Sequence, residues 1–474
     1  MDRRVLTLAA LSLAVFTVLL NVTVVNVNLP DIQRSLHTDV AGLEWVVNAY
    51  TLPLATLLLA AGSLGDRYGR KRIFLLSLFV FSLGSGLCSV ARSLDVLLAG
   101  RALQGIGAAA VLPGSLAIIS SVYPNPRQRA TAIGIWGGAN GLALATGPLI
   151  GGLLGDRFGW ESVFLLNVPV GLFAVVAGWL LIREAEGRGL RTALDPPAQV
   201  LTILWIAALT FALIQGNSWG WSSPRILLAL ALAVVGFAVF LSVERRTSQP
   251  MVPLGFFRNP TFSAANTVGF AIFFALQAAI FFLSLFLQNV QGDSPVEAGL
   301  RLTPLTGAFM LISPLAGSIA GHLGSRVPMV IGLVLTTAGL FLLSSLTPRT
   351  PYSTAWWRMA ILGIGFALTL APMTAAILAS VPQARAGTGS AIHTAARQVG
   401  GLLGIAALGA IAGAQGAMSP THGPPGSSAA IFARGMDVAL FTAGLVTLAA
   451  AVVAFAFVRT GEVQRRPAQQ AAGP

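Results

Sequence analysis

The chain has 474 residues, of which 55% are hydrophobic and 9% are charged, and its mean hydropathy is +0.79. A water-soluble fold of this length cannot hide so much apolar surface, so the composition excludes a soluble protein and indicates that lipid is the solvent. The net charge of +13 does not indicate a nucleic-acid partner, because the basic residues stand singly between apolar segments and form no patch.

Apolar stretches long enough to cross a bilayer core recur along the chain, at roughly 20 residues of helix per crossing. The first stretch follows Arg3 and Arg4 without a small-residue cleavage site, so we expect a retained helix and not a removable signal peptide. Glycine, proline and charged residues separate the stretches into fourteen predicted transmembrane helices, near 5–29, 43–65, 73–91, 94–122, 130–153, 161–182, 198–217, 225–243, 261–289, 297–320, 327–346, 357–381, 386–412 and 435–458.

The positions of the basic residues predict how these helices are oriented. With the N-terminus inside, nineteen of the 29 Lys and Arg residues fall in cytoplasmic segments and seven in outer segments, while Arg101, Arg301 and Arg397 lie within spans. Cytoplasmic loops carry such an excess. We therefore expect a multi-pass protein of the cell (inner or plasma) membrane with both termini in the cytoplasm.

Short motifs of the first half return in the second half. Residues Ala61–Gly65 have an echo in Ala316–Ala320 at an offset of 255, and Arg101 has an echo in Arg358 at an offset of 257. Echoes in the same order at a nearly constant offset indicate two homologous halves. The predicted domains are an N-terminal six-helix bundle, a linker with two additional transmembrane helices, a C-terminal six-helix bundle and a short cytoplasmic tail, over 1–183, 184–259, 260–458 and 459–474.

A basic, glycine-rich loop joins the second and third predicted helices and reads Gly62-Ser63-Leu64-Gly65-Asp66-Arg67-Tyr68-Gly69-Arg70-Lys71-Arg72. Its glycines permit a tight turn, and Asp66 can pair with neighbouring arginines. The loop resembles the signature loop of the major facilitator superfamily, a conformational latch between two halves. A merely topogenic basic loop, the alternative, would not need Asp66 or this glycine spacing. The resemblance assigns gating to Gly62, Asp66, Arg67, Gly69, Arg70 and Lys71.

A second motif of small residues lies on the fifth predicted helix. It consists of Gly141, Gly147, Pro148, Gly151 and Gly152. Small residues let helices pack closely, and Pro148 bends or softens the helix. The motif resembles the antiporter motif of the exporter branches; ordinary small-residue packing is the alternative.

Further stretches, including 20–32, 45–52, 164–171 and 394–398, are similar to segments of the fourteen-helix drug:proton antiporters. The resemblance covers nearly the whole chain. It implies an all-α major facilitator fold with two pseudo-symmetric six-helix bundles and two inserted helices. The implied function is secondary active export of amphipathic drugs, antibiotics or related small molecules by alternating access, coupled to proton influx.

One acid expected from this resemblance is missing. The first helix of the branch usually carries an aspartate immediately before Xaa-Thr, and here Asn21 stands in that place and cannot carry a proton. Arg101 resembles the intramembrane arginine implicated in proton transfer; a structural hydrogen-bond hub is the alternative. Two hypotheses for coupling stay open: Asp31 or Glu44 with Arg101 as electrostatic partner, or His393, which is otherwise an ordinary helix contact.

The missing acid also bears on the substrate. A cavity without a fixed negative charge favours neutral or weakly anionic amphipathic molecules over cations. Asn21 and Asn28 share a helical stripe that suits a polar cavity wall, although asparagines also join helices. Arg397 shares a helix face with His393 and is a further candidate for the cavity wall. The ninth helix offers an aromatic stripe with amide groups that suits a drug pocket, although phenylalanines often face lipid. The stripe consists of Asn266, Phe270, Phe273, Gln277 and Phe281.

Other classes of function fit less well. The histidines form no His-Glu-x-x-His motif, and the only lysine, Lys71, precedes Arg72, so a phosphate-binding loop is absent. We expect no catalytic residue, cofactor or metal, and a monomer whose partners are an amphipathic small molecule, protons and the bilayer. A channel is physically possible but fits a duplicated bundle with a latch loop less well. A dedicated exporter of one metabolite or self-made antibiotic, without proton coupling because of Asn21, is the main rival.

Overall fold

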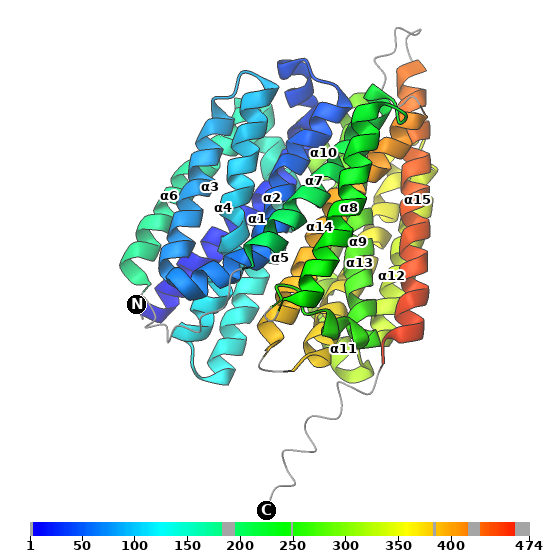
Figure 1. Ribbon diagram of the computed structural model, residues 1–474. Helices are drawn as coiled ribbons and strands as arrows, with labels where there is room; N and C mark the ends of the chain where they lie inside the picture. The colour runs from blue at the N-terminus through cyan, green and yellow to red at the C-terminus, as the bar shows by residue number, and fades with distance from the viewer. Residues whose placement is uncertain (1–2, 183–194, 248–249, 383–384, 416–426, 460–474) are drawn as a thin grey trace, which may run out of the picture. The chain divides into compact units, whose positions relative to one another are not determined.

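The computed structural model describes residues 3–182, 195–247, 250–382, 385–415 and 427–459, and these are helical with short connections and no strands (Figure 1). Within these ranges, fourteen helices are long and apolar enough to cross a membrane, which confirms the predicted number. Most of the predicted tail, from 460 onward, and the predicted linker segment 184–194 lie outside the described residues.

Contacts divide the chain into two compact units. The first unit comprises the residues up to Met251 together with Leu287–Leu300. Its helices are α1 (Arg3–Leu36), α2 (Val40–Tyr68), α3 (Arg70–Ser89), α4 (Leu94–Val122), α5 (Pro126–Phe158), α6 (Glu161–Leu181), α7 (Pro196–Trp219) and α8 (Pro224–Arg246), with most of the short π-helix η2 (Phe286–Val290) and of α10 (Pro295–Arg301).

The second unit comprises Val252–Phe286 and the residues from Arg301 onward. It begins with the 3-10 helix η1 (Leu254–Arg258). Its long helices are α9 (Pro260–Leu285), α11 (Thr303–Leu323), α12 (Arg326–Ser344), α13 (Tyr352–Ser380), α14 (Ala386–Ala414) and α15 (Ser427–Phe457).

The same pattern of helix pairing occurs in both units. In the first unit α1 packs on α5 and α6, α3 packs on α4 and α6, and α2 packs on α4. In the second unit α9 packs on α14 and α15, α12 packs on α13 and α15, and α11 packs on α13 (Figure 1). Helix α9 and helices α11–α15 thus repeat α1–α6. The predicted fold class, with two pseudo-symmetric six-helix bundles, is confirmed.

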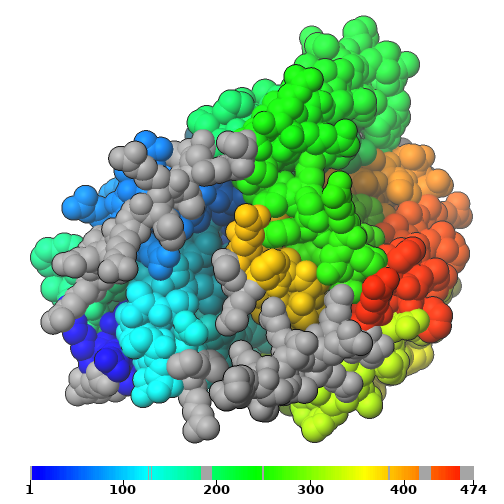
Figure 2. Space-filling view, turned by 60° about the horizontal axis from the view of Figure 1, so that its bottom comes forward, coloured from blue at the N-terminus to red at the C-terminus, as the bar shows by residue number. Residues whose placement is uncertain are grey.

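The two additional helices, α7 and α8, belong to the first unit. They pack on each other, and α7 also packs on α2, where Gln199 Nε2 donates to the carbonyl of Thr56 at 2.8 Å. Trp45 of α2 lies 6.3 Å from the ring of Phe211 on α7. Helix α8 leaves Leu228 and Val234 more than half exposed, and its atoms form part of the green surface in Figure 2. Such an apolar outer face is expected for a helix with lipid on most sides.

Two helix boundaries differ from the predicted ones. Helix α1 continues through Pro30 to Leu36, although the predicted span ends at residue 29. The predicted span 297–320 is interrupted at Leu302, between α10 and α11. Pro304 occupies the first turn of α11, where a proline costs no backbone hydrogen bond because the first-turn amides have no partner within the helix.

Close approach of α5 to α1 requires two glycines of the predicted antiporter motif. A Cβ atom on Gly151 would lie 2.5 Å from the carbonyl oxygen of Val24, and one on Gly147 would overlap the hydroxyl of Thr23. On another side of α5, a Cβ on Gly152 would overlap the carbonyl of Pro295. Gly141, in contrast, has nothing within 4 Å of its Cβ position. The motif therefore combines glycines in tight contact with one in open space.

We expect Gly151→Ala to lower the free energy of unfolding by about 1–3 kcal/mol, because α1 must move away from α5 to admit the methyl group. The same change at Gly141 meets open space and should leave stability unchanged or slightly raised. Thermal unfolding of the two variants in detergent micelles checks this difference. Equal midpoints for both variants would show that the α1–α5 contact is not tight.

Candidate functional site

The interior of the first unit contains a buried arginine whose partners are all neutral. Arg101 on α4 is 1% exposed. Its Nε donates to the carbonyl oxygen of Val46 at 2.9 Å, and its Nη1 donates to Oε1 of Gln104 at 2.9 Å. Its guanidinium carbon lies 4.5 Å from the centre of the Tyr50 ring. Hydrogen bonds and an aromatic face thus replace the water that the guanidinium gives up.

Gln104 extends this contact into a network that reaches Asn21. Gln104 Nε2 donates to the hydroxyl of Ser85 at 2.7 Å, and its Oε1 also accepts from Nδ2 of Asn21 at 3.5 Å. Asn167 Nδ2 donates to Oδ1 of Asn21 at 3.2 Å. The network joins α1, α3, α4 and α6. Asn21 and Arg101, which sequence reasoning considered separately, therefore meet through one glutamine.

An amide fits position 21 because the side chain there both donates and accepts a hydrogen bond. Asn21 is completely buried, donates to Gln104 and accepts from Asn167. An ionised aspartate could accept only, so it would leave the Gln104 oxygen facing another acceptor. Gln104 lies three residues after Arg101 on the same helix, and that spacing could have identified it from sequence; Asn167 had no such signal.

Asn28 connects α1 with α5. Its Nδ2 donates to the carbonyl of Val24 at 3.0 Å and to the carbonyl of Gly151 at 3.0 Å. Its Oδ1 has no hydrogen-bond partner among the described residues and faces Gly155, where any Cβ atom would overlap it. This amide therefore bonds across the same glycine-lined contact that brings the two helices together.

The predicted coupling acids of the first unit differ in their surroundings. Glu44 on α2 is 1% exposed, and its Oε2 has no hydrogen-bond partner in the part of the chain that the structure describes. Asn48, one turn further on, is also buried and bonds no described residue through its amide atoms. Asp31 instead pairs with Arg34, whose side chain is 75% exposed. A buried carboxyl with an unused oxygen is a better proton carrier than a paired surface carboxylate.

The predicted gating loop connects α2 to α3 through one residue with a positive φ. Gly69 has φ 102°, which glycine adopts without strain, so α2 ends at Tyr68 and α3 begins at Arg70. Arg70 Nε and Nη2 each lie 2.9 Å from Oδ1 of Asp66. Arg67 lies over the ring of Tyr68, and Gly62 has nothing within 4 Å of its Cβ position.

Two cationic side chains of this loop also bind helix carbonyls within the first unit. Arg70 Nη1 donates to the carbonyl of Ala117 at 3.4 Å, and Lys71 Nζ donates to the carbonyl of Trp179 at 2.8 Å. Trp179 lies in the last turn of α6, where unpaired carbonyls favour positive charge, and Ala117 lies about one turn before the end of α4 at Val122. The loop therefore connects the ends of four helices, α2, α3, α4 and α6.

In the second unit, candidate residues of α9 and α14 lie against each other at Gly269. A Cβ atom there would lie 2.7 Å from Cε1 of His393 and 3.3 Å from Cγ of Arg397. The guanidinium carbon of Arg397 lies 4.5 Å from the centre of the Phe273 ring. Gln277 packs against Gly401 further along the same contact.

Aromatic rings surround this contact. Phe273 lies 5.5 Å from the ring of Phe366, which lies 5.0 Å from the ring of Phe309, while Phe270 stacks on Phe274 at 6.0 Å. Asn266, which sequence reasoning grouped with these rings, is 5% exposed and donates to the carbonyl of Phe262 at 2.8 Å. Sequence reasoning missed Phe309 and Phe366, because no spacing relates them to α9.

We expect Gln104→Leu to lower the free energy of unfolding by about 2–4 kcal/mol, because Arg101 and Asn21 each lose an acceptor inside the bundle. Ser120→Ala on the same helix is the matched control, since that hydroxyl donates only to the Leu116 carbonyl of its own helix. Unfolding in detergent micelles measures both. A Gln104→Leu variant as stable as the Ser120→Ala variant would contradict the role of the network.

Comparisons with known proteins agree with this architecture. The family model described as Major Facilitator Superfamily matches residues 11–405. The chain is 38% identical over 408 residues to "Multidrug resistance protein Stp" of Mycobacterium tuberculosis, covering 86% of this chain and 76% of that protein. It is 34% identical over 503 residues to "Tetracenomycin C resistance and export protein" of Streptomyces glaucescens, covering 98% of this chain and 93% of that protein.

A solved structure shares the fold. The crystal structure of a bacterial homologue of the human lysosomal transporter Spinster, in an inward-facing and unoccupied conformation, matches with a TM-score of 0.69 and 21% identity over 97% of this chain and 98% of that one. The family match covers most of the chain, and the fourteen apolar helices and the repeated bundles agree with it. The chain belongs to the major facilitator superfamily and is a multi-pass membrane transporter, not an enzyme.

Proposed function

We propose that this transporter exports amphipathic drugs or antibiotics across the cell membrane by alternating access, in exchange for protons and with both termini in the cytoplasm. The observation that carries the proposal is the similarity to named resistance proteins, at 34% and 38% identity over most of the chain. The working unit is a monomer that needs no metal or cofactor.

The described contacts support an amphipathic substrate. Phe273, Phe309 and Phe366 form a chain of rings contributed by α9, α11 and α13. Arg397 lies on this chain through its contact with Phe273. Rings with a small number of polar groups among them bind flat apolar molecules and fix their orientation.

A dedicated exporter of one compound is the second candidate. The relative named for tetracenomycin C carries the name of a single antibiotic, and its match extends over 98% of this chain. The relative named for multidrug resistance covers less of the chain at higher identity. The two names therefore support different substrate ranges.

An efflux panel tests the proposal and separates the two candidates. Cells that lack their own exporters and express the chain should accumulate less of several chemically unrelated amphipathic dyes and antibiotics than cells with an empty vector. A dedicated exporter would lower the accumulation of one compound or one scaffold only. Unchanged accumulation across the panel, with the protein present in the membrane fraction, would refute export.

Glu44 is our candidate for the proton carrier in that exchange. In the same assay we expect a protonophore to abolish export by the wild type, and Glu44→Gln to remove most of the protonophore-sensitive export because an amide cannot take up a proton. Asp31→Asn is the matched control and should retain export, since Asp31 lies near the surface and pairs with Arg34.

Full protonophore-sensitive export by both Glu44→Gln and Asp31→Asn would exclude the two acids and leave His393 as the remaining titratable candidate. Arg101 has neutral partners and is expected to position the network and not to carry the proton.

The Asp66–Arg70 pair is our candidate for the gating latch. Both side chains are more than one third exposed, so the pair contributes at most about 1 kcal/mol to stability. We expect Asp66→Asn to leave the unfolding midpoint within a few degrees of the wild type but to lower the export rate about tenfold or more. Arg72→Gln, an exposed arginine of the same loop, should leave both unchanged. Loss of stability in parallel with transport would indicate a structural role instead.

A further inference from the structure

The second unit is almost without negative charge. Its segments, Val252–Phe286 and Arg301 onward, contain two acids, Asp437 and Glu462. Asp437 lies exposed on α15, and Glu462 lies outside the described residues. A cation in the interior of this unit therefore has no carboxylate of its own unit to pair with among the described residues.

Arg397 is such a cation. It stands eleven residues into α14, a helix of 29 residues, which places it about 16 Å from the helix start at 1.5 Å per residue. This is near the middle of a membrane-spanning helix, where an arginine is costly unless it meets a partner or a water-filled cavity. An anionic partner would stabilise Arg397 at this depth, and the described residues of the unit do not provide one.

Several hydrogen-bonding atoms at and around Arg397 have no partner among the described residues. Its Nε, buried in the bundle, has no hydrogen-bond partner among the described residues. Both ring nitrogens of His393, one turn earlier and 2% exposed, lack a partner as well, and so does Oδ1 of Asn266. Arg101 of the first unit shows the contrast, since its Nε and Nη1 both donate. Buried polar atoms are normally hydrogen-bonded, so the Arg397 Nε–H and the one N–H of a neutral His393 point to a missing acceptor.

The geometry also indicates the shape of that ligand. Phe273 lies against one face of the Arg397 guanidinium at 4.5 Å, so the ring does not occupy the edge that carries the N–H groups; the Nε on that edge is enclosed and unpaired, and side chains must move to admit a ligand. That edge binds a carboxylate through two parallel hydrogen bonds. Phe366 lies 5.5 Å from the Phe273 ring and extends this apolar wall. Donor edge and ring wall together fit an aromatic molecule that carries an acidic group.

We propose that Arg397 and His393 bind the anionic group of the exported molecule, a carboxylate or an ionised phenol or enol, while its ring system packs on Phe273. The inference rests on the proposed export function and specifies its substrate class. It favours organic anions over the lipophilic cations that a carboxylate-lined cavity would select.

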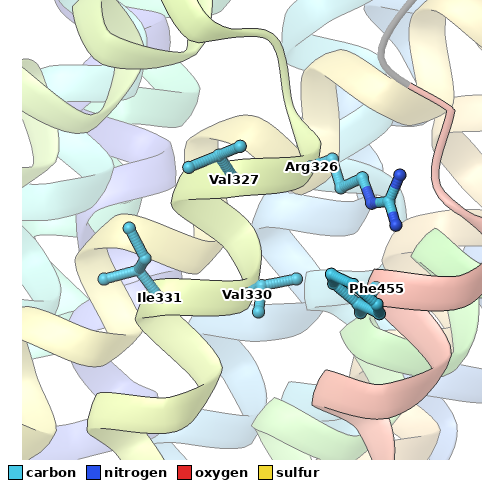
Figure 3. Close-up of a pocket in the computed structure, with 5 residues that line it drawn as sticks. All are labelled: Arg326, Val327, Val330, Ile331 and Phe455. Carbon is cyan, nitrogen blue, oxygen red and sulfur yellow. The ribbon is translucent and has the colours of Figure 1, made fainter.

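A surface pocket of the same unit supplies a matched control. Arg326 lies 4.5 Å from the ring centre of Phe455, the same distance as in the Arg397–Phe273 contact. The pocket is lined by Arg326, Val327, Val330, Ile331 and Phe455, and Figure 3 shows the guanidinium beside the ring while Val327 and Ile331 point away from it. Arg326 begins α12, so this arginine is at a helix end and not at mid-helix.

The test uses two dyes with the same ring skeleton and opposite charge, fluorescein as the anion and rhodamine 123 as the cation. Fluorescence anisotropy with the purified full chain in detergent should show fluorescein bound at least about tenfold more tightly than rhodamine 123. Arg397→Gln should weaken fluorescein binding about tenfold or more without weakening rhodamine binding. Arg397→Lys should retain part of the preference, and Arg326→Gln should retain all of it.

A second readout separates binding from a structural role. Without dye, Arg397→Gln should unfold at a temperature equal to or above that of the wild type, because it removes a mid-helix charge that has no carboxylate partner among the described residues. Fluorescein should raise the unfolding temperature of the wild type and not that of the variant. A variant that unfolds earlier than the wild type and loses both dyes equally would make Arg397 structural and overturn the proposal.

The remaining outcomes distinguish failure of the anion site from failure of the export function. Export of rhodamine 123 with no binding of fluorescein would leave the export function standing and refute the anion site. Fluorescein binding that depends on Arg397, with no compound of the panel exported, would support the site and refute export. Chloride is tested by replacing it with gluconate in the export assay. Export that stops without chloride, in a protein that shows no preference between the two dyes, would assign Arg397 to inorganic chloride and overturn the proposal.

Discussion

A hydrogen-bonding side chain inside a lipid-embedded bundle cannot turn to water, so it must find its partner in the protein or in a ligand. This constraint organises both units. In the first unit Arg101 reaches Val46, Gln104 and the Tyr50 ring, and Gln104 passes the network on to Asn21. In the second unit Arg397 contacts one ring, and its Nε and the nitrogens of His393 have no partner among the described residues. The first arrangement is complete within the fold, whereas the second is complete only when something binds.

Glycine contacts bring the helices close enough for these networks, and the second unit repeats them. On α14, Cβ atoms at Gly400 and Gly404 would overlap the carbonyls of Phe270 and Phe274 on α9, just as Gly151 of α5 abuts Val24 of α1. Helices α14 and α9 correspond to α5 and α1 in the repeated pairing. The small residues on α5 therefore have a packing role that the duplication preserves, whatever further role the antiporter motif has in transport.

The sequence predicted what depends on composition and on local spacing. Long apolar runs fixed the number of helices, and the repeated motifs indicated two equivalent bundles. The arginines near Asp66 in the loop were sufficient to suggest an ion pair, and the structure contains one between Asp66 and Arg70. Spacing along one helix could not reveal that Asn167 meets Asn21, or that Phe366 meets Phe273, because both contacts depend on how separate helices pack. The roles of these residues in transport remain predictions.

The distribution of acids separates the two proposed tasks. Of the 16 acidic residues, all but Asp437 and Glu462 belong to the first unit. A carboxyl proton carrier buried in the described helices must therefore belong to the first unit, as Glu44 does, while the unused arginine belongs to the second.

Glu44 would take up a proton and Arg397 an anion, so on these proposals the two transported species do not compete for one side chain. On the proposed function, exchange must then be enforced by a conformational change that both sites bias. The proposed latch between α2 and α3 suits such a change, because its ion pair is exposed and weak. Breaking the pair therefore costs little free energy, and the transporter can pass between its two conformations. A single shared carboxylate, as in a cation exporter, would need no such division.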